Sequence, residues 1–187
     1  KRGYIYLLTP AGVAAKAVFT PEAGFGWRTP DGLKDLTRPA EREWRKSYYH
    51  NDRDVPPPVC LNELTQDLVG SEAPAEFVVS VPPGDYTVWV LAGFPAGYPP
   101  AVNDFMVNAG AGDVLVSLPQ HSMFESKFIP AKAGADGLVV RFAPETGFVV
   151  NALAVFAAAD EARARQEFVG PIDREVFLLP PDLKTLV

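Results

Sequence analysis

Near the middle of the chain the sequence reads Phe77-Val-Val-Ser-Val-Pro-Pro-Gly-Asp-Tyr-Thr-Val-Trp-Val-Leu91, the stretch with the clearest strand pattern. Apolar residues recur at every second position from Phe77 to Val81 and again from Tyr86 to Val90, which is the period of a β-strand. The four residues between them, Pro82-Pro-Gly-Asp85, have the composition of a turn. We therefore predict an antiparallel hairpin with one face toward a core.

Further short strands are predicted on both sides of this hairpin, separated by turns such as Gly110-Ala-Gly-Asp113. They are expected at Tyr4–Leu8, Val13–Phe19, Trp44–Tyr49, Asn103–Asn108, Val114–Leu118, Lys127–Pro130, Leu138–Phe142 and Phe148–Phe156. About ten short strands at this spacing predict an all-β protein, a jelly-roll β-sandwich. The last strand is almost wholly apolar, so we expect it to be central and buried on both faces.

The remaining segments are predicted to be helix, loop or tail. Gly24-Phe-Gly-Trp27 suits a tight bend or bulge, and Asp31 to Arg45 suits a long loop. Leu61 to Val69 fits either a short helix or an irregular strand. Ala157 to Phe168 predicts one helix, and Val169 to Val187 an extended, proline-bearing tail. We divide the chain into a β-sandwich domain, 1–157, and a C-terminal helix with a linker or arm, 158–187.

Composition and charge exclude several classes of function. Among the 187 residues, 17 Lys and Arg stand against 23 Asp and Glu, a net charge of −6 without a basic cluster, so we expect no nucleic-acid partner. No apolar run is long enough to cross a bilayer, so we expect no membrane partner. The single cysteine, Cys60, can form neither an intramolecular disulfide nor a zinc site by itself. A first residue other than Met indicates a mature or excised segment.

Two stretches carry a family resemblance, Leu61-Asn-Glu-Leu-Thr-Gln-Asp67 and Ala75-Glu-Phe-Val-Val-Ser-Val-Pro-Pro-Gly-Asp-Tyr-Thr-Val-Trp-Val90. They resemble the galactose-binding-like β-sandwiches, malectin-like modules included, that are attached to bacterial polysaccharide lyases, glycosidases and carbohydrate esterases. Those modules close with a strand similar to Val149-Val-Asn-Ala-Leu-Ala-Val155, and often carry a stretch like Gly24-Phe-Gly-Trp27. The resemblance covers about residues 3 to 157.

The resemblance implies a jelly roll that works outside the cytoplasm, secreted, extracellular or periplasmic. It also implies a catalytic domain elsewhere in the same polypeptide and a poly- or oligosaccharide as ligand. Many relatives hold a structural calcium, but no acidic cluster of this sequence maps onto that site. We therefore expect no cofactor, keep a structural calcium as an alternative, and leave the metal ligands unassigned.

Sugar binding needs flat aromatic faces and fixed polar groups, and three places in the sequence offer them. Trp44-Arg-Lys-Ser-Tyr-Tyr-His-Asn-Asp-Arg53 combines both kinds of side chain, and Phe94-Pro-Ala-Gly-Tyr98 displays two aromatics in a loop. Trp89 lies out of step with the core residues of the central stretch. The candidate carbohydrate contacts are Trp44, Tyr48, Tyr49, Arg53, Phe94, Tyr98 and Trp89. The alternative is that these aromatic residues pack into the core.

Catalytic patterns are missing from the sequence. There is no Gly-x-Ser-x-Gly elbow, and His50 and His121 are the only histidines, without the spacing of a metal site. We therefore expect a non-catalytic carbohydrate-binding accessory domain of an extracellular polysaccharide-degrading enzyme, with no catalytic residue of its own. The alternatives are a structural or interaction sandwich that braces a catalytic domain without a glycan site, and the non-catalytic lobe of a hydrolase or lyase.

Overall fold

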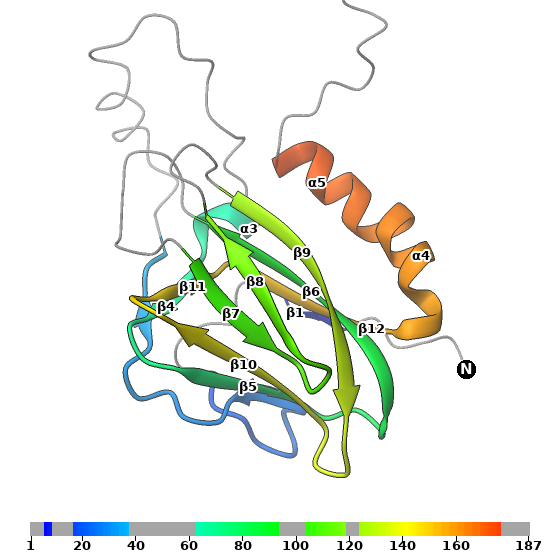
Figure 1. Cartoon of the computed structure of the whole chain (residues 1–187), viewed down its shortest axis with the longest axis horizontal. Coiled ribbons are helices and arrows are strands. Elements are labelled where there is room, and N and C mark those ends of the chain that lie inside the picture. The colour runs from blue at the N-terminus through cyan, green and yellow to red at the C-terminus, as the bar shows by residue number, and fades with distance from the viewer. Residues whose placement is uncertain (1–5, 9–16, 38–62, 94–103, 119–123, 177–187) are drawn as a thin grey trace, which may run out of the picture.

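The computed structural model describes residues 6–8, 17–37, 63–93, 104–118 and 124–176, and within them the chain forms an all-β sandwich with one C-terminal helix (Figure 1). All strand pairs are antiparallel except for isolated bridges. This confirms the all-β sandwich predicted from the sequence. None of the helices in the described ranges is long and apolar enough to cross a membrane.

Two large sheets and one small sheet make up the sandwich. The four-stranded sheet has the order β1 (Tyr6–Leu8), β12 (Ala152–Ala157), β6 (Gly84–Gly93) and β9 (Phe124–Ala133). The five-stranded sheet has the order β2 (Phe25–Trp27), β5 (Ala75–Val79), β10 (Leu138–Pro144), β7 (Asp104–Asn108) and β8 (Asp113–Ser117). The small sheet has the order β11 (Phe148–Val150), β4 (Val69–Ser71) and β3 (Lys34–Asp35).

Aromatic rings fill the core between the sheets. The indole of Trp27 meets the ring of Phe77 edge-on, with centroids 5.1 Å apart, and the rings of Phe142 and Phe148 stack at 4.9 Å. All four side chains are fully buried. Burial of this much apolar area is the main driving force for bringing the sheets together.

The central stretch is not the hairpin that its alternation predicts. β5 pairs with β2 and β10 in the five-stranded sheet, whereas β6 pairs with β12 and β9 in the four-stranded sheet. The chain between them therefore crosses from one sheet to the other. Pro82 and Pro83 lack the backbone N–H groups that a ladder continuing toward the turn would need. Parts of both strands are also buried on both faces, because Val78 on β5 and Trp89 on β6 are as buried as their neighbours.

The apolar stretch 148–156 is buried on both faces as predicted, but it forms two strands rather than one. β11 joins the small sheet through β4, and β12 joins the four-stranded sheet through β1 and β6. Asn151 separates them, and its side-chain amide donates to the backbone carbonyl of Asp67, 3.2 Å away. A polar side chain that bonds to the backbone in this way ends the regular pairing.

β1 and β12 join distant parts of the chain. Tyr6 pairs with Val155, so the two partners are 155 − 6 = 149 positions apart. The segment expected at 4–8 is thus an edge strand over its described residues.

The bend expected at Gly24–Trp27 contains a short strand, β2. Gly26 has φ +147°, and a Cβ atom there would lie 2.5 Å from the backbone nitrogen of Phe19. The missing side chain lets the segment around Phe19 pass close over β2. In the strand expected at 13–19, residue Val18 forms one parallel bridge to Trp27.

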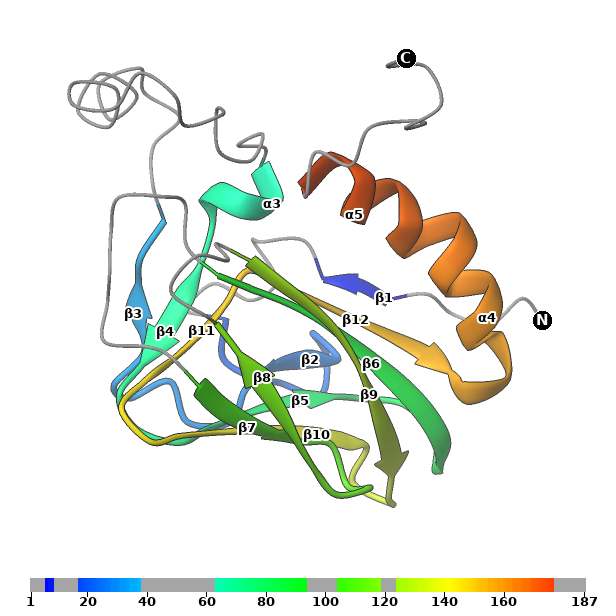
Figure 2. The same ribbon diagram turned by 45° about the horizontal axis from the view of Figure 1, so that its top comes forward.

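Two helices lie at Leu61–Val69 and after β12. The first segment holds a single short helix, α3 (Glu63–Gln66), before β4 begins. The second comprises a 3-10 turn (Ala158–Asp160), α4 (Glu161–Ala164), a π-helical turn (Arg165–Val169) and α5 (Gly170–Val176). Figure 2 shows them as one continuous helix beside β12.

This helix extends beyond Phe168, into the region that the sequence predicts to be extended. Pro171 removes one N–H of the ordinary helical pattern, and the N–H of Gly170 bonds to the carbonyl of Arg165. The π-helical turn precedes the proline and lets the helix continue. Apolar residues at Ala164, Phe168 and Ile172 keep one face against the sheet. The tail predicted beyond residue 176 lies outside the described residues.

Candidate functional site

Six of the seven residues predicted to contact a sugar lie outside the described residues: Trp44, Tyr48, Tyr49, Arg53, Phe94 and Tyr98. Their assignment remains a prediction.

The structure corrects the seventh prediction, that Trp89 contacts a sugar. Its side chain is fully buried, and the indole Nε1 donates to Ser126 Oγ at 2.7 Å. Its ring meets the ring of Phe168 on the helix edge-on, with centroids 6.2 Å apart. Trp89 is out of step with the core because it faces a second apolar cluster under the helix, so it is not exposed to a sugar.

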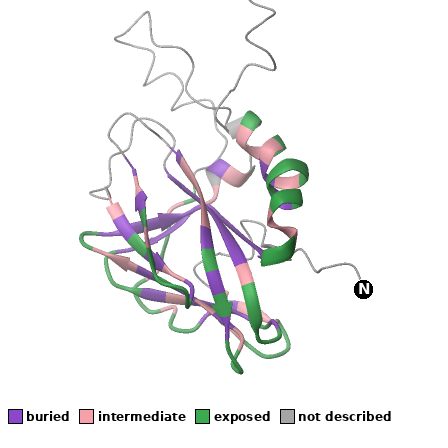
Figure 3. Ribbon diagram, turned by 45° about the vertical axis from the view of Figure 1, so that its right-hand side comes forward, coloured by how far each residue is buried: buried purple, intermediate pink, exposed green. Residues whose placement is uncertain are grey.

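The second apolar cluster lies between the helix and the outer face of the four-stranded sheet, which we call the covered face. It consists of Trp89, Leu91, Phe124, Ala152, Ala154 and Phe156 from the sheet, with Ala164, Phe168, Val169 and Ile172 from the helix. Figure 3 shows buried, intermediate and exposed residues in turn along the helix, and its buried residues, Ala164 and Val169, belong to this cluster. The helix is therefore part of the fold, and this face is closed to ligands.

Polar groups fasten the helix to the covered face. The hydroxyl of Thr87 donates to Glu161 at 2.7 Å, and this bond, with that from Arg165, lowers the pKa of Glu161. The guanidinium of Arg165 lies over the ring of Phe128, 3.6 Å from its centroid. Burial raises the pKa of Asp173, partly offset by a hydrogen bond from Ser126. These groups act in docking the helix.

The outer face of the five-stranded sheet, which we call the open face, carries a row of polar side chains. In the strand register Glu76 is opposite Arg141, Arg141 is opposite Asn108, and Asn108 is opposite Asp113. The neighbours in sequence of Glu76, Arg141 and Asn108 are buried, as with Val140 and Phe142 beside Arg141, and Val114 beside Asp113 packs against the core. Four adjacent strands, β5, β10, β7 and β8, thus each place one polar side chain in a single line, the polar row.

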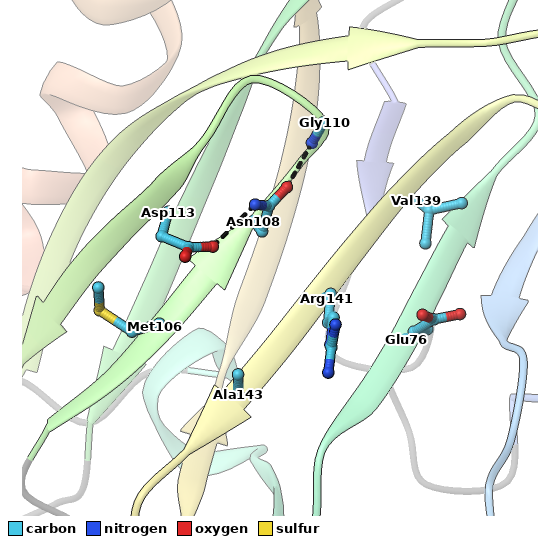
Figure 4. A pocket seen from close by; sticks show the side chains of 8 residues that line it. All are labelled: Glu76, Met106, Asn108, Gly110, Asp113, Val139, Arg141 and Ala143. Carbon is cyan, nitrogen blue, oxygen red and sulfur yellow. Dashed lines mark hydrogen bonds between the residues drawn. The ribbon is translucent and has the colours of Figure 1, made fainter.

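Hydrogen bonds fix both ends of the polar row. Arg28 Nη1 donates to Glu76 Oε2 at 2.7 Å. At the other end Asn108 Nδ2 donates to Asp113 Oδ1 at 2.7 Å, and the backbone N–H of Gly110 donates to Asn108 Oδ1 at 2.8 Å (Figure 4). Such bonds hold the side chains in place before any ligand arrives, which lowers the entropy cost of binding.

Arg141 lies between these two pairs. It is exposed and has no hydrogen-bond or ion-pair partner among the residues that the structure describes. A guanidinium carries five N–H donors in one plane and suits recognition of paired oxygen atoms. Arg141 is therefore the group of the polar row that is most available to a ligand.

Apolar side chains form a second line beside the polar row. Ala143 is opposite Met106 and Met106 is opposite Leu115 in the register, and we call these three the apolar row. Met106 is 38% exposed and Leu115 47%, so two large apolar side chains face solvent together. Beyond them Ser117 Oγ donates to Asp104 at 2.7 Å.

Between these groups the open face is hollowed, with a volume of about 500 Å³. Side chains from β5, β10 and β7, together with Asp113 at the start of β8, line the hollow (Figure 4). Because the strands pair along their whole described length, the lining is carried by rigid backbone. The arrangement combines donors, acceptors and apolar surface, which is the combination that small polar ligands need.

The sequence predicts which residues of each strand face outward, but not which of them lie next to one another. Less buried residues alternate with buried ones in Asp104–Asn108 and around Arg141, so an outward face can be read from each strand alone. The line across four strands depends on their order and register, which connect residues as distant as Glu76 and Asp113.

Many of the modules that the sequence resembles hold a structural calcium, for which carboxylate and carbonyl oxygens are the usual ligands. Within the described ranges, no group of three or more His, Cys, Asp or Glu side chains is placed to hold a metal. The buried Oδ1 of Asn151 has no hydrogen-bond partner, but Nδ2 of the same side chain donates to the carbonyls of Thr65 and Asp67. A cation at those carbonyls would face that amide nitrogen, which carries no lone pair to offer.

Comparison with known proteins gives structural matches only. No family model matches the sequence, and no curated protein matches it. A Bacillus subtilis protein, YxiM, is similar in structure over 78% of this chain, with a TM-score of 0.50 and 18% identity. A plant receptor-like kinase, FER, matches 68% of the chain with a TM-score of 0.47 and 17% identity.

A Bacteroides uniformis β-glucuronidase matches 52% of this chain and 12% of its own, with a TM-score of 0.41 and 15% identity. This chain spans 35% of the Bacillus protein and 34% of the plant kinase, about a third of each. At such low identity the match to the Bacillus protein shows the fold alone. What the comparisons establish is that this chain shares its β-sandwich fold with part of a larger bacterial protein.

Proposed function

We propose that the chain is a non-catalytic carbohydrate-binding accessory domain of an extracellular or periplasmic polysaccharide-degrading enzyme. The observation that carries this proposal is the open face, where a polar row and an apolar row lie side by side over a hollow. The sequence resemblance to sugar-binding sandwiches supports the same class of ligand.

The two rows match the two sides of a sugar ring. Hydroxyl groups accept hydrogen bonds from Arg141 and donate to the carboxylates of Glu76 and Asp113. The C–H groups of the same ring pack against Met106 and Leu115, whose exposed surface is otherwise unfavourable in water. A site open to solvent along the sheet suits an extended chain.

The spacing of the carboxylates supports binding rather than hydrolysis. Glu76 and Asp113 are three strand spacings apart, about 14 Å at the usual distance between strands. Glycosidases that invert configuration place their two carboxyl groups about 6.5–9.5 Å apart, and retaining ones closer still. This pair is therefore too far apart to act on one glycosidic bond.

Affinity electrophoresis in gels that contain polysaccharides tests the proposal. We expect retention on at least one polysaccharide, and Arg141→Ala should weaken it about tenfold or more, as loss of charge-assisted hydrogen bonds does. Arg163→Ala is the matched control, since it removes an exposed arginine from the helix on the covered side. Migration unchanged by every polysaccharide, neutral and acidic, would rule out the proposal.

A second candidate is a sandwich that braces a catalytic neighbour, and the exposed Met106 and Leu115 favour it. β8 is an edge strand of the five-stranded sheet, and an exposed edge with apolar side chains can pair with another domain. In the full-length enzyme, Leu115→Lys would then lower the melting temperature of the catalytic domain. If the chain binds glycan instead, the same change alters retention in the gel and leaves that temperature unchanged.

A further inference from the structure

We propose that the open face takes a neutral glycan, a chain of uncharged hexose or pentose units, and discriminates against uronic and sulfated chains. This inference rests on the proposed function and names its ligand class. It follows from the order of donors and acceptors along the polar row and from the balance of charge around it.

The polar row alternates between groups that accept and groups that donate. Glu76 uses Oε2 for Arg28, and Asp113 uses Oδ1 for Asn108, so each carboxylate keeps a second oxygen as an acceptor. Between them Arg141 offers only donors. A ligand that satisfies acceptor, donor and acceptor in turn must both give and receive hydrogen bonds. Vicinal hydroxyl groups do so, whereas an ionised carboxylate or sulfate only accepts.

Charge around the row points the same way. The charged residues of β5, β10, β7 and β8 are Glu76, Arg141, Asp104 and Asp113, and Arg28 pairs with the first. Two positive and three negative groups give 2 − 3 = −1. Arg141 is therefore no isolated positive site, because Glu76 is its direct neighbour across the sheet. An anionic group on Arg141 would lie close to that carboxylate, and like charges at such distances repel.

The apolar row requires an uncharged surface in the same ligand. Met106 lies two residues from Asn108 on β7, about 7 Å along the strand, which is on the scale of one sugar ring. A ring whose hydroxyls reach the polar row thus presents its C–H face to Met106 and Leu115. A charged substituent on that side would lose its hydration without a partner.

Carboxylate-to-amide substitutions distinguish a neutral from an anionic glycan, because they change the affinity in opposite directions for the two. Asp113→Asn and Glu76→Gln keep the size of the side chain and one carbonyl acceptor, but remove a negative charge. For a neutral glycan they weaken binding a few-fold, since a charged acceptor becomes a neutral one. For an anionic glycan they strengthen binding, since a repulsion is removed. Both residues are at the surface, so the variants should fold, and a thermal melt checks this.

The probes are galactan, mannan, xyloglucan and xylan on the neutral side, and polygalacturonate, alginate and dextran sulfate on the acidic side. Each is tested with wild type, Arg141→Ala, Asp113→Asn, Glu76→Gln and the control Arg163→Ala. Gels at about 0.1 M and about 1 M NaCl add a second readout, because salt shortens the range of charge interactions from about 10 to about 3 Å.

The expected result is retention on a neutral glycan that changes less than about twofold with salt and weakens in all three site variants. Retention on an acidic polymer alone, lost in high salt and strengthened by Asp113→Asn, overturns this inference and leaves the proposed function intact. Retention on a neutral glycan that Arg141→Ala and Asp113→Asn leave unchanged places the site elsewhere and also overturns it. No retention on any polymer removes the proposed function itself.

Discussion

The covered face and the open face are the two outer surfaces of one sandwich, and they differ in the polarity of their outward-facing side chains. On β6 the outward residues Trp89 and Leu91 are large and apolar, and the helix buries them. On β10 and β7 the outward residues include Arg141 and Asn108, and no described element covers them. The inward residues are apolar on both sheets. The outward residues, rather than the inward ones, therefore distinguish the sheet that docks a helix from the sheet that keeps an open surface.

The largest expected effect comes from breaking the covered face. Trp89→Ala should lower the free energy of unfolding by about 3–5 kcal/mol, since it leaves a cavity between sheet and helix and removes the bond to Ser126. Leu115→Ala on the open face is the comparison, and it should cost less than about 0.5 kcal/mol because its side chain is half exposed. Urea denaturation measures both. Equal losses would contradict the contrast between the faces.

A smaller effect is expected at β2, the edge strand of the five-stranded sheet against which the segment around Phe19 packs. Gly26→Ala should cost about 1–3 kcal/mol, because a Cβ atom would meet the backbone of Phe19 and Val18, and φ of +147° disfavours a side chain. Gly134→Ala is the control, since no atom lies within 4 Å of its added Cβ. Thermal unfolding of both variants tests this. A Gly26→Ala protein as stable as Gly134→Ala would show that the segment around Phe19 does not lie against β2.

The smallest effect concerns the half-buried carboxyl of Asp173 on the helix. Burial raises the pKa of Asp173 in the folded protein, so the folded state holds that proton more tightly than the unfolded chain does. Stability from this group is therefore present at low pH and decreases as pH rises from the ordinary value through the raised one. Asp173→Asn should remove this decrease and raise the stability near neutral pH by up to about 1 kcal/mol.

Melting temperatures between mildly acidic and neutral pH measure the effect of Asp173→Asn. The control is Asp136→Asn, which makes the same chemical change in the exposed turn before β10, away from the helix. A pH profile for Asp173→Asn that parallels the wild-type profile would mean that burial against the sheet does not raise the pKa of the Asp173 carboxyl.

Local pattern was sufficient to predict the class of fold, because alternation and turn composition are properties of short segments. Local pattern did not predict which strands pair with one another. The residues Phe77 to Leu91 alternate as a hairpin does, yet β5 and β6 belong to different sheets, since which strands pair is settled by the whole core. Likewise Asn151 divides an apolar run only because the carbonyl of Asp67 happens to face it.

The candidate site was harder to predict than the fold for the same reason. Arg141 and Asn108 can each be read as exposed from their own strands, but their adjacency depends on register. Trp89 was predicted as a contact because it breaks step with the core, and the helix that explains this begins about seventy positions later. Gly170-Pro171 resembles a helix end, but a π-helical turn before the proline and packing of Ile172 against the sheet let the helix continue.

The pairing of Tyr6 with Val155 has a consequence for how the protein folds. The four-stranded sheet cannot be completed until the segment that ends with β12 has been synthesised, because β1 and β12, its first and last described strands in sequence, are neighbours. Sheets built from such distant partners fold slowly, over about milliseconds to seconds, because loop closure precedes the gain from pairing. The apolar strands β6 and β12 must wait for the helix, the last element to be synthesised among those that cover them. During that interval they are the surfaces that a chaperone would bind.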